Sequence, residues 1–128
     1  MISPSLNLPQ SSHSYKILAV GNDLGTLEAS ASVLLGAGYG VSSVTLQQTL
    51  KYLDSEQFDA VVLCHTLKSR EVSAVLALVK SVNHNLPVVQ IYSHAPDPAF
   101  RFVAPSYNPS SLLSVLSWAL QRDVRATA

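Results

Sequence analysis

The stretch from Phe58 to Leu67 reads FDAVVLCHTL. Within it, Ala60–Cys64 is a continuous apolar run, which is typical of a central parallel strand that is covered on both faces. Open α/β proteins place their functional groups beyond the carboxyl ends of such strands. This stretch therefore predicts a parallel sheet, and it makes Cys64, the chain's only cysteine, a candidate site residue.

The segments on either side of this strand alternate between strand and helix patterns. Further strands are expected at 15–20, 41–45, 87–92 and 100–103, and helices at 24–35, 46–53, 72–79 and from Asn108-Pro109 to about residue 122. Only SHAPDPA, residues 93–99, separates the last two strands, and it is too short and proline-rich for a helix of normal length. The pattern predicts an α/β sandwich in which this helix is shortened or lost.

Length and composition restrict the class of protein. The 128 residues amount to one domain, expected at 14–125, after a flexible N-terminal tail at 1–13. Eight basic and eight acidic residues cancel, so neither nucleic acid nor an anionic membrane is expected as a partner. The chain shows neither a signal peptide nor an apolar stretch long enough to span a membrane. We therefore expect a cytoplasmic protein.

Four segments together resemble the receiver domain of response regulators, the CheY-like family. They are KILAVGNDLGTLEASASVLLGAGYGV (16–41), FDAVVLCHTL (58–67), PVVQIY (87–92) and VAPSYNPSSLLSVL (103–116). The resemblance covers roughly residues 15 to 122. It implies a flavodoxin-like fold with strand order 2-1-3-4-5, and a role in two-component (phosphorelay) signalling.

The positions that carry the family's chemistry have changed. The acidic pair that holds Mg²⁺ corresponds to Gly21 and Asn22, and the phosphoacceptor aspartate corresponds to Cys64. The switch hydroxyl, the small residue after it and the lysine correspond to Tyr92, Ser93 and Ala104. Without carboxylates, metal or lysine, phosphoryl transfer loses its nucleophile and its charge stabilisation. We therefore expect a pseudo-receiver that is not phosphorylated, with no catalytic residue, metal or cofactor.

Several readings of Cys64 remain open. It can be a small buried filler, or the thiol of a redox sensor if a nearby cation or helix N-terminus lowers its pKa. Its neighbour His65 should point to the opposite face of the strand. The scattered histidines do not make a zinc site with one cysteine. A third possibility is a small-molecule site in the flavodoxin-like crevice above Gly21 and Cys64.

Asp23 follows the acidic-pair positions and is expected to cap the first helix. On the last helix, Trp118 falls nearly opposite the apolar face, and an outward tryptophan is a common interface anchor. We expect an interaction surface on the fifth strand and last helix, formed by Phe100, Phe102, Val115 and Trp118. Its partner is an unknown signalling protein or, in the simplest case, a second copy in a homodimer.

Overall fold

The computed structural model describes residues 15–96, 100–106 and 108–127, with side chains as far as residue 121. The expected tail at 1–13 lies outside this range. The strands are β2 (Lys16–Val20), β3 (Gly40–Val44), β4 (Ala60–Leu63), β5 (Val88–Tyr92) and β6 (Phe102–Pro105). The helices are α2 (Leu24–Gly36), α3 (Leu46–Ser55), α4 (Ser69–Asn83) and α5 (Pro109–Thr127).

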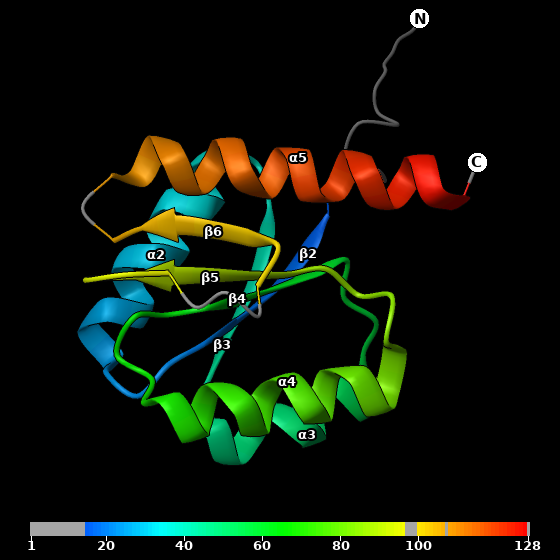
Figure 1. Ribbon diagram of the computed structural model, residues 1–128, viewed down its shortest axis with the longest axis horizontal. Coiled ribbons are helices and arrows are strands. Elements are labelled where there is room, and N and C mark those ends of the chain that lie inside the picture. Colours follow the sequence, from blue (N-terminus) through cyan, green and yellow to red (C-terminus); the bar gives the residue numbers. More distant parts are fainter. Residues whose placement is uncertain (1–14, 97–99, 107, 128) are drawn as a thin grey trace, which may run out of the picture.

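The strands form one parallel sheet in the order β3-β2-β4-β5-β6. Counted along the chain, this is the expected order 2-1-3-4-5, so the predicted flavodoxin-like fold is confirmed. Helices α2 and α5 cover one face of the sheet, and α3 and α4 cover the other (Figure 1). Because the strands are parallel, their carboxyl ends all lie at the same end of the sheet. The loops at that end bring the candidate site together.

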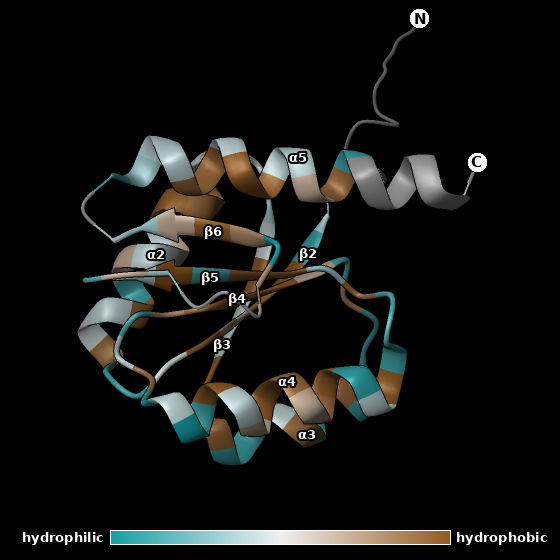
Figure 2. Ribbon diagram, viewed as in Figure 1, coloured by the Kyte–Doolittle hydropathy of each residue, from teal (hydrophilic) through white to brown (hydrophobic). Residues whose placement is uncertain are grey.

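Each face of the sheet has its own core. Side chains of β2, β4, β5 and β6 pack under α2 and α5, including Ile17, Val62 and Ile91. The alternate residues of the sheet, such as Leu18 and Leu63, pack against α3 and α4. Figure 2 shows the hydrophobic residues along the strands and on the helix sides that face them. This two-sided burial explains why β4 reads as an unbroken apolar run.

The helix boundaries follow from local capping. The Asp23 side chain accepts a hydrogen bond from the Thr26 N–H and thereby caps α2, as expected. Asn108 accepts one from the Ser111 N–H at the start of α5, where Pro109 takes the first helical position. None of the helices in the described part of the chain is long and apolar enough to cross a membrane.

The connection from β5 to β6 departs from the usual alternation. No helix is present in the described residues between Tyr92 and Phe102. The last strand begins at Phe102, two residues later than the expected 100–103, because pairing with β5 starts with Val89 opposite Phe102. Phe100 precedes the strand and packs against the core on the α3 and α4 side. On that face, the described part of the chain places only two helices over five strands.

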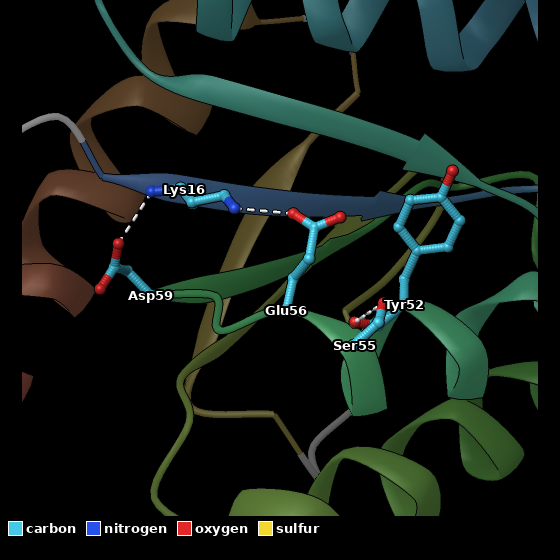
Figure 3. A network of polar contacts seen from close by, with 5 residues as sticks. All are labelled: Lys16, Tyr52, Ser55, Glu56 and Asp59. Atoms are coloured by element: carbon cyan, nitrogen blue, oxygen red, sulfur yellow. Dashed lines mark hydrogen bonds and ion pairs between the residues drawn. The ribbon is translucent and has the colours of Figure 1, made fainter.

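Polar contacts hold the amino-terminal end of β2 in place, at the end of the sheet opposite the candidate site (Figure 3). The Lys16 ammonium forms an ion pair with Glu56 at 2.6 Å, and the Lys16 backbone N–H donates to Asp59 at 2.8 Å. Ser55 donates its hydroxyl to the carbonyl of Tyr52 in the last turn of α3. The two Lys16 contacts fasten the start of β2 to the segment that leads from α3 into β4. They lie far from the strand ends where the site is expected.

Candidate functional site

Gly21, just after the end of β2, leaves little room for a side chain. A Cβ atom built on it would lie 3.1 Å from the Cys64 Cβ and 3.2 Å from Cγ and Cδ2 of Leu27. Gly21 is itself buried, and its N–H donates to the carbonyl of Val44. The position that corresponds to one half of the family's acidic pair therefore cannot receive a carboxylate without moving its neighbours.

Cys64 occupies the space beside Gly21. Its side chain is 1% exposed and packs with Ala19 and Leu27. Burial raises the pKa of the Cys64 thiol, and a contact with the Ser30 hydroxyl at 3.8 Å only partly opposes this effect. His65, next in the chain, is exposed and lies in the turn after β4, where the alternation expected along a strand no longer applies. Cys64 is thus a neutral, buried thiol at physiological pH, without the features that make a cysteine reactive.

Asn22 joins two loops through its side chain and its backbone. Its Nδ2 donates to Glu71 Oε1 at 2.7 Å and to the Thr66 carbonyl at 3.4 Å. Its backbone N–H donates to Thr66 Oγ1 at 3.3 Å. Glu71 Oε1 also accepts the Lys68 N–H at 2.8 Å, which caps α4. These contacts form a bridge, made by Asn22, Thr66, Lys68 and Glu71, between the loop after β2 and the loop after β4.

The electrostatics of the bridge agree with its geometry. The Lys68 N–H and then the Asn22 amide lower the pKa of Glu71 by stabilising its carboxylate. Likewise, the hydroxyl and then the backbone N–H of Thr26 lower the pKa of Asp23. Both carboxylates are therefore ionised at neutral pH, but hydrogen-bond donors of the chain already bind them.

The other three predicted site residues lie on the last two strands or directly after them. Ala104 is fully buried inside β6, paired with Ile91, and not beyond the end of the strand. Tyr92 ends β5 half-buried, and its carbonyl accepts the Ser106 N–H at 2.8 Å. Ser93 is exposed. The described residues contain no group of three or more His, Cys, Asp or Glu side chains placed to hold a metal ion.

The four residues expected to form an interaction surface do not share one exposed face. Phe102 is a core residue, 7% exposed, and Phe100 lies on the other side of the sheet. Val115 is half-buried. Trp118 is 48% exposed, and its ring stands edge-on to Phe102 with the ring centroids 5.2 Å apart. Trp118 therefore points outward and still rests on the core through this aromatic contact.

A pocket of about 350 Å³ lies beside the degenerate site, between the start of α2 and the start of α5. Asp23, Thr26 and Ser30 line it from α2, and Ile91 and Leu112 from β5 and α5. Neither Gly21 nor Cys64 lines it, so it is not the crevice that the sequence suggested. Among the residues that matter here, Thr66, Glu71 and Ser30 were not anticipated. Glu71 stands at the third helical position of α4, as in a capping box, but the N-cap residue is Lys68, which is not one of the usual capping residues, so the sequence offered no clear signal.

Comparisons with known proteins agree with this fold. No family model and no curated protein matches the chain. Among solved structures, a CheY-like receiver domain from Methanospirillum hungatei is 18% identical, with a TM-score of 0.77 over 88% of this chain and 98% of that one. A response regulator receiver protein from Sinorhizobium medicae is 20% identical, with a TM-score of 0.74 and the same coverage.

A third similar structure contains a bound magnesium ion. It is the receiver domain of a sensor histidine kinase from Pseudomonas aeruginosa, with magnesium coordinated in its active-site cleft. That domain is 13% identical to this chain, with a TM-score of 0.73 over 84% of this chain and 98% of its own. At these identities the likeness establishes the fold, and the chemistry has to be argued from the residues present.

Proposed function

We propose that this chain is a cytoplasmic receiver-like domain of two-component signalling that acts by binding another protein and is not phosphorylated. The observation that carries the proposal is the contact between Gly21 and Cys64. It replaces one half of the acidic pair and the acceptor carboxylate with a closed, apolar junction. The Asn22 amide donates to the Glu71 carboxylate and to the Thr66 carbonyl, so these oxygens are already bound by a donor of the chain and Asn22 itself supplies no carboxylate for Mg²⁺.

Incubation with acetyl phosphate and Mg²⁺ is expected to leave the mass of the protein unchanged. No carboxylate stands at the acceptor position, and the buried Cys64 thiol is neutral. Intact-protein mass spectrometry measures the result. A stoichiometric gain of one phosphoryl group that persists in Cys64→Ser, or that disappears when Mg²⁺ is left out, would contradict the proposal.

A thiol-sensor function finds less support. A sensor cysteine needs an accessible thiolate, whereas Cys64 is 1% exposed and burial raises its pKa. No second cysteine exists to resolve an oxidised intermediate. These features favour Cys64 as a packing residue between β4 and α2.

For the protein contact, we propose the face of α5 around Trp118, with a second copy of the chain as its occupant. Residues 109–121 of α5 carry no charged side chain, and Trp118 is 48% exposed on their outer side. In a two-fold symmetric contact each patch meets itself, so an uncharged patch avoids like-charge repulsion. An exposed tryptophan is also the residue type that most often dominates binding energy.

Trp118→Ser is expected to abolish concentration-dependent self-association in sedimentation velocity. Leu50→Ser is the matched control, because Leu50 is 44% exposed on α3, in the other helical layer, and its removal should leave association unchanged. Circular dichroism verifies that Trp118→Ser remains folded after losing the contact with Phe102. A wild-type protein that is monomeric at every concentration would rule out the second copy as the occupant.

A further inference from the structure

The pocket between α2 and α5 has the construction of a small-ligand site. Its floor is apolar and preformed, because Ile91 and Leu112 are 6% and 5% exposed and belong to the core. Its volume of about 350 Å³ falls at the lower end of the range of ligand pockets, roughly 300–1,000 Å³. It lies at the carboxyl edge of the parallel sheet, where open α/β folds bind their ligands.

Small side chains on α2 leave this space open. Gly25, Ala29 and Ser30 all line the pocket from the first two turns of the helix. Larger side chains at these positions would fill the space between α2 and the start of α5. The pocket therefore results from the choice of residues on α2, and a single larger side chain should close it.

The rim determines which ligands suit the pocket. Asp23 contributes a carboxylate, of which Oδ2 accepts hydrogen bonds from Thr26 N and Oγ1 at 2.9 and 2.8 Å. Within the described part of the chain, this carboxylate has no ion-pair partner. His65, Ser106 and Asn108 add a ring nitrogen, a hydroxyl and an amide, and no lysine or arginine lines the pocket. A ligand anion would therefore meet the full negative charge of Asp23, with only the partial positive charges of the helix N-termini and no permanent cation to offset it.

We propose that this pocket binds a small ring compound that carries a primary amine. The ring would cover Ile91 and Leu112, and the ammonium group would lie at the rim beside the carboxylate of Asp23. Burial of the ring provides affinity without specificity, whereas the ammonium group distinguishes amines from acids of the same shape. The proposal assigns a ligand to a site next to the degenerate phosphorylation residues, and it does not depend on how the domain contacts its partner.

The test is an amide-resolved NMR titration of the whole chain at neutral pH with phenethylamine and with hydrocinnamate. The two probes share a ring and a short chain, and they carry opposite charges. Phenethylamine is expected to shift the amides around Thr26, Ser30, His65 and Leu112, and hydrocinnamate to bind more weakly. If neither probe shifts these amides at millimolar concentration, or if hydrocinnamate binds at least as tightly, the proposal is wrong.

Three variants sharpen the test. Asp23→Asn removes the charge but keeps an N-cap residue of equal quality, so α2 should stay intact. Asp23→Asn is expected to weaken the binding of phenethylamine up to about fivefold, as for an exposed charge pair. It should not weaken the binding of hydrocinnamate. Glu28→Gln neutralises an exposed carboxylate of α2 outside the pocket and should change neither affinity. Ala29→Leu should abolish the binding of both probes, because the larger side chain fills the cavity. Equal effects of Asp23→Asn and Glu28→Gln would overturn the proposal.

Discussion

Gly21→Ala is expected to lower the free energy of unfolding by about 1–2 kcal/mol. The added methyl group would lie 3.1–3.2 Å from Cys64 and Leu27, which are both buried. Neither neighbour can retreat easily, because the Cys64 N–H is bonded to the Val20 carbonyl and Leu27 is buried between α2 and the sheet. Overpacking of this kind typically costs about 1–3 kcal/mol, and the lower entropy of the unfolded chain returns a few tenths.

Gly21→Asp should be more harmful than Gly21→Ala, with a loss of about 3 kcal/mol or more. It adds the same overlap and also places a carboxylate in a buried, apolar junction. Returning the family's acidic residue to this one position should therefore damage the fold without rebuilding a metal site.

Gly36→Ala is the matched control for Gly21→Ala. Gly36 lies at the end of α2, and no atom comes within 4 Å of a Cβ built on it. The substitution should leave stability unchanged or raise it by up to about 1 kcal/mol. Urea unfolding of the three variants and the wild type measures the differences. If Gly21→Ala proved as stable as Gly36→Ala, the closed junction would not exist as described.

Most of the fold could be predicted because its signals are local. The unbroken apolar run at Ala60–Leu63 identified a buried parallel strand, and Asp23 and Asn108-Pro109 marked helix starts through capping chemistry. The start of the last strand was misplaced, because Phe100 and Phe102 both read as strand residues. Only the pairing with β5 decides between them, and that pairing is not encoded locally.

The candidate site was predictable only in part. The strand ends at Leu63, so the expected alternation of neighbours does not extend to Cys64 and His65, and the exposure of His65 follows from its place in the turn after β4. The bond from Asn22 to Glu71 joins residues 49 positions apart, so it depends on the packing of two loops that local patterns do not describe. Local patterns do not predict the pocket either, because it exists only where the small residues of α2 face the start of α5 in the folded chain.

Asn22→Ala is expected to lower the free energy of unfolding by about 1 kcal/mol, the usual net contribution of a side-chain hydrogen bond. The substitution removes the bonds from Nδ2 to Glu71 and to the Thr66 carbonyl, and it keeps the backbone bond to Thr66 Oγ1. Asn22→Asp should be worse at neutral pH, because it replaces a donor with a second carboxylate facing Glu71. Restoring the other half of the acidic pair would thus also destabilise this domain.

The pH dependence distinguishes this explanation from a general loss of packing. In the wild type, hydrogen bonds lower the pKa of Glu71, so its contribution is complete above the usual glutamate value of about 4.3 and is lost as the pH falls through the lowered value. In Asn22→Asp the two facing carboxylates repel one another at neutral pH, and protonation of either one relieves the repulsion. The stability difference between the two proteins should therefore be largest above about pH 6 and shrink towards pH 4.

Asn85→Asp provides the control for this pH series. Asn85 is exposed just after α4, and its replacement should change stability by no more than about 0.5 kcal/mol at any pH. Urea unfolding at several pH values measures all three proteins. A difference between Asn22→Asp and wild type that stays constant with pH would mean that Glu71 does not face Asn22 in solution. A stability difference that disappears in acid would show that carboxylates at positions 22 and 71 face one another. The bridge would then require a neutral amide at position 22, where the family has an acidic residue.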